Sequence, residues 1–209
     1  MNWLQWFTAQ ARDIDWLQWT AVGTGVISVY LSVKQRIWSW PTALVNVALY
    51  FVVFKNERLY ADMGLQVIYF VLSLYGWYEW LYGGENKTEL KVSRATAAMA
   101  VRLAGITIVG VAVLGTLFSR YTDAALPYVD SATATVSLVA QWMMTRKVLE
   151  NWAVWIAVDV VYVGMFVYKH LYPTAALYAG FLVLALMGHL QWLRSFRSDH
   201  APDAPPVPA

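Results

Sequence analysis

Cysteine is absent from this sequence, charged residues are sparse, and only three histidines occur among its 209 residues. The absence of cysteine excludes disulfide bonds, thiolate metal sites and a cysteine nucleophile. His170, His189 and His200 do not have the spacing of metal ligands, so a metalloenzyme is not expected. Only 13% of the residues are charged and 59% are hydrophobic. This composition is not that of a soluble domain, and a lipid bilayer is the environment that it fits.

The basic residues neither form a long run nor dominate the charge. The formal net charge is +2, and the lysines and arginines fall in short, scattered groups. A nucleic-acid-binding surface is therefore not expected. Near the start of the chain there is no cluster of positive charge, and Arg12, Asp13 and Asp15 precede the first long apolar run. A cleaved signal peptide is not expected either.

Seven apolar runs have the length that a helix needs to cross hydrocarbon, roughly 17 to 25 residues. We therefore predict an all-α integral membrane protein with seven transmembrane helices, at residues 16 to 33, 38 to 54, 61 to 82, 95 to 118, 128 to 145, 151 to 168 and 172 to 195. The segment from Gly83 to Arg94 is rich in glycine and charge. It is expected to form a solvated loop between the third and fourth helices.

These runs divide the chain into parts. We expect an N-terminal interfacial segment at residues 1 to 15, a first three-helix unit at 16 to 82, a loop and linker helix at 83 to 118, a second three-helix unit at 119 to 195 and a disordered cytoplasmic tail at 196 to 209. Tryptophan and phenylalanine in the first segment favour a short interfacial helix, with a frayed terminus as the alternative. The tail is expected because the chain becomes proline-rich after Ser198.

The distribution of lysine and arginine predicts the orientation, because positively charged loops are retained in the cytoplasm. One side of the predicted helices carries Arg12, Lys55, Arg58, Arg120 and Lys169. The other side carries twice as many, namely Lys34, Arg36, Lys87, Lys91, Arg94, Arg102, Arg146, Lys147, Arg194 and Arg197. We expect the N-terminus outside and the C-terminus in the cytoplasm.

An internal repeat is visible when the sequence is shifted by 112 positions. The shift places like residues in register, among them Trp40 on Trp152, Tyr50 on Tyr162, Phe54 on Phe166, Gly76 on Gly188 and Trp80 on Trp192. It leaves the fourth predicted helix unmatched, so the plan is three plus one plus three. Displacement by four helices preserves direction, which makes the repeats parallel. This is the arrangement of the small sugar carriers called SWEETs, in which the substrate lies between the halves.

Ionisable residues are rare in the predicted helices, and each one needs a partner or water there. Asp159 lies near the middle of the sixth helix, and the spacing of three and four places it on one face with Trp152, Trp155 and Tyr162. Two interpretations stand. Asp159 accepts a hydrogen bond that joins two helices, or this face contacts a ligand.

Similar polar stripes occur on three other predicted helices. Asn46 and Tyr50 lie four apart in the second, and Asn46 is either an interhelical hydrogen bond or a ligand contact. In the third, Asp62, Gln66 and Tyr69 share a face. Hydration or the helix N-terminus explains Asp62 as well as a ligand does, and Gln66 is the better candidate. The fifth contributes a stripe of Thr133, Ser137 and Gln141.

The tryptophans and tyrosines fall into two groups. Trp3, Trp6, Trp16, Trp19, Trp77, Trp80 and Trp192 are expected in the aromatic belts at the membrane surfaces. Trp155, Tyr50, Tyr69, Tyr162 and Tyr178 fall deeper, on or near the polar stripes. Flat rings beside amide and carboxylate groups suit a planar, polar and cationic ring that stacks on them.

Together these residues resemble the bacterial nicotinamide riboside transporters of the PnuC family. The resemblance covers nearly all of residues 16 to 195. It is carried by Trp38 to Pro41 with Asn46 and Tyr50, by Tyr60 to Gln66 with Gly76 and Trp77, and by Asn151, Trp152, Trp155, Asp159 and Tyr162.

The resemblance implies a bacterial inner-membrane transporter that binds nicotinamide riboside near the midplane and carries it by facilitated diffusion. Phosphorylation in the cytoplasm would then retain the riboside, so neither a cofactor nor a coupling ion is needed. It also implies a homo-oligomer, such as a trimer. Thiamin or riboflavin is the alternative substrate within the family. A structural membrane subunit is a further alternative, whereas an enzyme is not expected because the buried Ser and Asp lack a partnering His or Lys.

Overall fold

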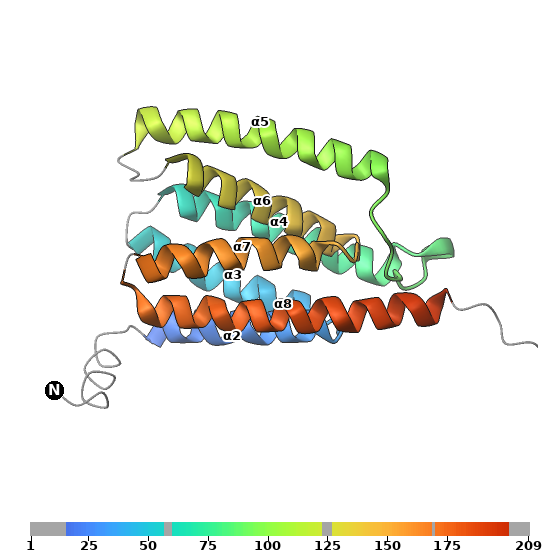
Figure 1. The fold of residues 1–209 in the computed structure, drawn as a ribbon. Coiled ribbons are helices and arrows are strands. Elements are labelled where there is room, and N and C mark those ends of the chain that lie inside the picture. The colour runs from blue at the N-terminus through green and yellow to red at the C-terminus, as the bar shows by residue number, and fades with distance from the viewer. Residues whose placement is uncertain (1–15, 57–59, 123–126, 169, 201–209) are drawn as a thin grey trace, which may run out of the picture. The chain divides into compact units, whose positions relative to one another are not determined.

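The computed structural model describes residues 16–56, 60–122, 127–168 and 170–200. These residues form seven α-helices and one short 3-10 helix (Figure 1). The α-helices are α2 (Trp16–Val33), α3 (Ser39–Asn56), α4 (Tyr60–Tyr82), α5 (Ala97–Tyr121), α6 (Pro127–Thr145), α7 (Asn151–Tyr168) and α8 (Tyr172–Asp199), and the 3-10 helix is η1 (Glu85–Lys87). All seven predicted helices are present, and their bounds agree with the prediction to within four residues.

The largest shift is at the end of α8, which continues to Asp199. Residues 196–199 are therefore helical, and the expectation of a disordered segment starting at residue 196 is wrong for them. The ring of Phe196 stacks on His200 with 4.3 Å between the centroids, a contact at helical spacing that favours continuation of the helix. The predicted interfacial segment and the rest of the tail lie outside the described residues.

The chain divides into two compact units, residues 1–77 and 78–209. In the first unit α2 packs along α3. The Ser28 hydroxyl donates a hydrogen bond to the carbonyl oxygen of Ser39 at 2.9 Å and joins the two helices near their connection. The indole ring of Trp40, on α3, lies directly against Gly76 of α4. A small residue at that contact lets the two helices approach closely.

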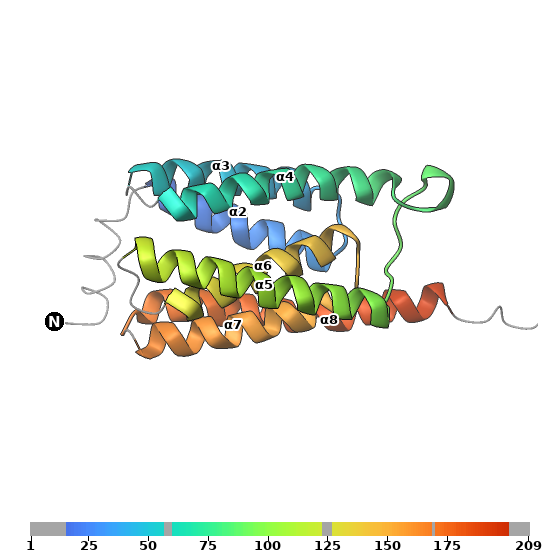
Figure 2. The same cartoon turned by 90° about the horizontal axis from the view of Figure 1, so that it is seen from above.

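In the second unit α5 packs on α6, α6 on α7, and α7 on α8. Figures 1 and 2 both show α7 and α8 side by side along their length. Small residues again permit close packing, because α5 meets α6 where Gly110 faces Thr135 and Gly115 faces Tyr128. On α6 the side chains of Ser131, Thr133, Thr135 and Ser137 are all buried.

The internal repeat is confirmed in the backbone. Helices α3 and α7 begin and end 112 positions apart, and so do the starts of α4 and α8. The α2–α3 connection contains Gln35 at φ 52°, and the α6–α7 connection contains Lys147 at φ 46°, again 112 positions apart. Six backbone hydrogen bonds recur in residues 34–42 and 146–154, among them Arg36 N to Leu31 O (2.9 Å) and Val148 N to Met143 O (3.0 Å). Helix α5 has no counterpart among the described helices.

Among the described helices, α5, α7 and α8 are long and apolar enough to cross a membrane by length and composition. The other four have 18 to 23 residues, enough for a span, but contain more polar residues. Helix α5 is almost unburied, with only Gly115 enclosed, and it exposes Val101, Ile108 and Val109. Such a surface fits contact with lipid hydrocarbon.

Candidate functional site

Asn46 has a structural partner. Its side-chain Nδ2 donates a hydrogen bond to the carbonyl oxygen of Ala21 at 2.5 Å and so ties α3 to α2. Gly25 leaves room for this amide, because a Cβ atom there would come within 2.9 Å of Nδ2. The side-chain nitrogen of Asn46 therefore forms the interhelical hydrogen bond that was one of the two interpretations. The amide oxygen Oδ1 has no hydrogen bond in the described part of the chain.

Asp159 is buried in the third turn of α7, with 5% of its surface exposed. Its carboxyl group forms no hydrogen bond or ion pair with the residues that the structure describes. Burying an ionisable group without a partner is costly, and such groups in membrane helices are usually functional. No described residue donates the hydrogen bond that would let Asp159 join two helices. Asp159 therefore remains a ligand candidate. Trp155, one turn earlier, is half-buried.

The three α4 candidates differ in exposure. Asp62 is exposed in the first helical turn, where the helix dipole stabilises a carboxylate. Gln66 and Tyr69 are half-buried. The amide of Gln66 has no hydrogen bond among the described residues. On α6, Gln141 is also half-buried, whereas the Thr133 hydroxyl donates to backbone oxygens of its own helix at 3.0 Å. Thr133 is thus satisfied without a ligand.

Tyr50 and Tyr162 occupy equivalent positions in the two repeats and each stacks on a phenylalanine one turn later. The ring centroids are 5.6 Å apart for Tyr50 and Phe54, and 5.9 Å apart for Tyr162 and Phe166. In the second repeat a third ring joins the pair. Tyr178 of α8 lies 4.7 Å from Tyr162 and 5.2 Å from Phe166. The sequence placed Tyr178 near a polar stripe but did not predict this cluster.

Trp152 packs against other tryptophans and does not line an open site. Its ring contacts Trp192 edge-on at 5.4 Å, and Trp192 lies 5.9 Å from Trp80. All three are at most 1% exposed. The expectation that Trp80 and Trp192 belong to a surface belt is therefore wrong, because α4, α7 and α8 pack these rings together. Trp16 and Trp19 are exposed, as a belt requires.

Lys147, in the α6–α7 connection, is 1% exposed. Its Nζ lies 3.2 Å from Glu89 Oε1 and 4.6 Å from the centroid of the Trp80 ring. The Trp80 indole nitrogen donates to the carbonyl oxygen of Met144 at 3.1 Å. Burial lowers the pKa of Lys147, and the Glu89 carboxylate partly offsets that lowering.

Further contacts fasten the loop after α4 to the same connection. Ser93 forms an isolated parallel bridge with Val148. The Arg146 guanidinium lies 2.9 Å from the Glu79 carboxylate. The backbone nitrogen of Ala95 donates to Glu150 Oε2 at 2.8 Å. The predicted solvated loop is thus anchored at its second half.

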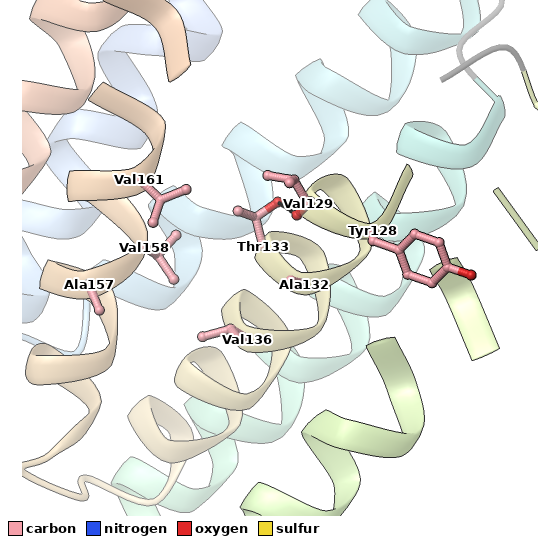
Figure 3. Close-up of a pocket in the computed structure, with 8 residues that line it drawn as sticks. All are labelled: Tyr128, Val129, Ala132, Thr133, Val136, Ala157, Val158 and Val161. Carbon is pink, nitrogen blue, oxygen red and sulfur yellow. Dashed lines mark hydrogen bonds between the residues drawn. The ribbon is translucent and has the colours of Figure 1, made fainter. Parts of the chain in front are cut away.

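A pocket of about 380 Å³ lies between α6 and α7. Figure 3 shows its lining, and the Tyr128 hydroxyl points away from Val158 and Val161. The lining residues are Tyr128, Val129, Ala132, Thr133, Val136, Ala157, Val158 and Val161. This surface suits hydrocarbon, and Thr133 is the one residue of the polar stripes in its lining. Among the described residues no cluster of His, Asp and Glu could hold a metal ion.

Two parallel three-helix repeats, with an unmatched helix between them in sequence, are the architecture of a small membrane transporter and not of an enzyme. The family model described as "Nicotinamide mononucleotide transporter" matches residues 15–194. The chain belongs to this transporter family, which includes PnuC.

Several relatives are similar over most of the chain. The nicotinamide riboside transporter PnuC of Escherichia coli (strain K12) is 29% identical over 216 residues, which cover 90% of each protein. The riboflavin/roseoflavin transporter RibM of Streptomyces davaonensis is 28% identical over 214 residues and all of both chains. The crystal structure of the vitamin B3 transporter PnuC superimposes with a TM-score of 0.72 at 25% identity, over 93% of this chain and 88% of that one. The predicted seven-helix fold class is confirmed.

Proposed function

We propose that this vitamin transporter carries nicotinamide riboside by facilitated diffusion, with a binding site near the midplane of the membrane. The observation that carries the proposal is the match to PnuC in sequence and in fold over nine-tenths of the chain. The unpartnered carboxyl of Asp159 supports it, because the pyridinium ring of nicotinamide riboside is a cation that a buried carboxylate would balance.

The remaining candidates supply the contacts that such a ligand needs. The amides of Gln66 and Gln141 and the free oxygen of Asn46 are hydrogen-bonding groups for the ribose hydroxyls and the carboxamide. Tyr50, Trp155 and Tyr162 offer faces on which a cationic ring stacks. Asp62, Tyr69 and Trp152 complete the proposed set, although the exposure of Asp62 and the enclosure of Trp152 favour them least.

Net uptake in this proposal is driven outside the transporter. Phosphorylation of the riboside in the cytoplasm removes the transported form, so that diffusion continues inward. We propose that neither ATP nor a coupling ion is used by the chain itself. The test is uptake into proteoliposomes. Without a kinase, the internal concentration of riboside should stop rising when it equals the external concentration. With a riboside kinase and ATP enclosed, the internal riboside and its phosphate together should exceed the external concentration.

A binding measurement with candidate vitamins identifies the substrate. The purified protein in detergent should be titrated calorimetrically with nicotinamide riboside, thiamin and riboflavin. Saturable binding of nicotinamide riboside alone is the expected result. Binding of riboflavin or thiamin in its place would overturn the substrate assignment and retain the transporter class.

Riboflavin is the alternative that a specific observation favours, because the alignment with RibM spans all of both chains. Its three-ring system is longer than a pyridinium ring and uncharged. A riboflavin carrier would therefore gain little from the Asp159 carboxylate. Substituting this residue distinguishes the two ligands, as argued in the Discussion.

We further propose that the protein lies in the bacterial inner membrane with its N-terminus outside and its C-terminus in the cytoplasm. The excess of lysine and arginine on the side of the α2–α3 and α6–α7 connections supports this orientation. A C-terminal alkaline phosphatase fusion should be inactive and a C-terminal green fluorescent protein fusion fluorescent. The opposite pattern would reverse the topology.

A further inference from the structure

The two repeats place an aromatic pair at the same point. Tyr50 stacks on Phe54 with 23° between the ring planes, and Tyr162 stacks on Phe166 with 17°. Both pairs lie on the second helix of their repeat, 112 positions apart. The repeats therefore present nearly the same flat aromatic surface.

In the second repeat the protein itself covers this surface. Tyr178 of α8 lies 4.7 Å from Tyr162 at 39°, and 5.2 Å from Phe166 at 28°. These separations are those of stacked aromatic rings. Phe181 supports Tyr178 from the next turn, with 5.9 Å between the centroids. Tyr178 thus takes the place beside the pair that another ring could otherwise occupy.

In the first repeat the residue equivalent to Tyr178 is Gln66. The packing register is the same, because Trp40 lies on Gly76 as Trp152 lies on Gly188, and these contacts are also 112 positions apart. This register assigns Gln66 of α4 to the position that Tyr178 has on α8. Glutamine brings no ring, and its amide has no hydrogen bond among the described residues.

We propose that the aromatic ring of the transported vitamin takes, in the first repeat, the place that Tyr178 takes in the second. The ring stacks on Tyr50 and Phe54, and Gln66 pairs with the amide substituent of the ring. The Oε1 of Gln66 accepts from the ligand N–H, and Nε2 donates to the ligand carbonyl. This subsite rests on the proposed function, since it requires a planar ring that bears an amide.

The subsite also selects among the aromatic candidates. Tyr178 already lies against Tyr162, so Tyr50 is the better of the two equivalent rings for a ligand to stack on. Among the described residues, the ring of Tyr50 stacks on Phe54 alone. A cationic pyridinium ring gains attraction from the electron-rich face of a tyrosine. Gln66 is then the residue that sets specificity for the ring's substituent.

The decisive variant introduces into the first repeat the tyrosine that the second repeat has at the equivalent position. Gln66→Tyr should fill the subsite with the protein's own ring and weaken nicotinamide riboside binding by about 30-fold or more. Val67→Tyr is the matched control, because it adds the same side chain at the next residue, which is 51% exposed. It should bind within about threefold of the unaltered protein. Thermal unfolding in detergent establishes that both variants are folded.

A second variant keeps the test decisive if Gln66→Tyr does not fold. Gln66→Leu preserves the side-chain volume and removes the amide. It should lose about 10-fold for nicotinamide riboside and nothing for a pyridine riboside that lacks the carboxamide, because that ligand has no group for Gln66 to pair with. A structural role for Gln66 would weaken both ligands equally and overturn the proposal, as would full affinity in Gln66→Tyr.

The unaltered protein separates this inference from the proposed function. If it binds riboflavin and not nicotinamide riboside, the substrate proposal fails, while the same variants test the subsite with riboflavin, whose ring system also carries an amide-like edge. If it binds none of the three vitamins, both proposals fail together.

Discussion

The ring of Trp152 lies so close to Gly188 that a Cβ atom on this glycine would come within 2.5 Å of the indole. Trp152 cannot move away easily, because Trp192 holds it edge-on. Gly188→Ala should therefore lower the free energy of unfolding by about 1–3 kcal/mol, the usual cost of overpacking. Thermal unfolding monitored by tryptophan fluorescence measures this loss.

Gly180→Ala on the same helix is the matched control for that prediction. A Cβ at residue 180 meets nothing within 4 Å, and alanine is the better helix former, so the variant should be at least as stable as the unaltered protein. Trp152→Phe should restore part of the loss in the double variant, since a smaller ring leaves room for the methyl group. Equal stability of the two alanine variants would contradict the close contact.

Lys147 should make stability depend on alkaline pH. Its pKa in the folded protein is lowered by burial, whereas the unfolded chain has an ordinary lysine pKa of about 10.4. Between these two values the unfolded chain holds a proton that the folded protein has released. The free energy of unfolding therefore rises with pH in this window. Below the folded pKa the charged form is buried and its cost is fully present.

Lys147→Met removes this contribution and keeps an unbranched side chain at the same backbone angle. Relative to the variant, the unaltered protein should gain thermal stability as the pH rises from 7.5 towards 10.5. Lys91→Met, which makes the same substitution at an exposed lysine of the preceding loop, is the matched control. Parallel pH profiles for the unaltered protein and Lys147→Met would show that the buried lysine does not titrate differently on folding.

Asn46 combines an observed structural role with a proposed binding role. Asn46→Ala removes the hydrogen bond to Ala21 and should cost about 0.6–2 kcal/mol of stability, the range for such bonds between membrane helices. Val45→Ala, at the adjacent exposed position, controls for the loss of side-chain volume. Calorimetry on the folded variant then measures affinity separately. Unchanged affinity would confine Asn46 to its structural role.

Asp159→Asn tests the charge of the proposed ligand. The substitution keeps the size and polarity of the side chain and removes its negative charge. Affinity for the cationic nicotinamide riboside should fall about 10-fold, while the uncharged reduced riboside should lose little. Calorimetric titration of both forms provides the comparison. Equal losses would mean that Asp159 shapes the site without balancing the charge.

The positions of the helices could be predicted because the signal is local. Each apolar run is long enough to span hydrocarbon, and the charged or turn-forming residues between the runs mark the ends. The repeat was predictable for a similar reason, since equivalent residues such as Trp40 and Trp152 recur at one constant spacing. The end of α8 was missed because the helix continues past Arg197 into solvent, where composition is a poor guide.

The candidate site was less predictable, because spacing along a helix places residues on a face but does not identify the neighbour of that face. The stripe that contains Asn46 was visible, whereas its hydrogen bond to Ala21 was not. Trp80 and Trp192 have the sequence context of belt residues, yet helix packing buries both. Lys147 was counted as a loop charge and lies buried beside Trp80.

The sequence by itself determined the membrane class, the helical spans, the 112-residue period and the family to which the chain belongs. These properties depend on composition and on periodicities within single segments. Only the tertiary structure decided that Tyr178 lies on Tyr162 and Phe166, whereas Tyr50 stacks on Phe54 alone among the described rings. The reason is that ring stacking depends on the rotation and register of one helix against another, and residues far apart in the chain set both.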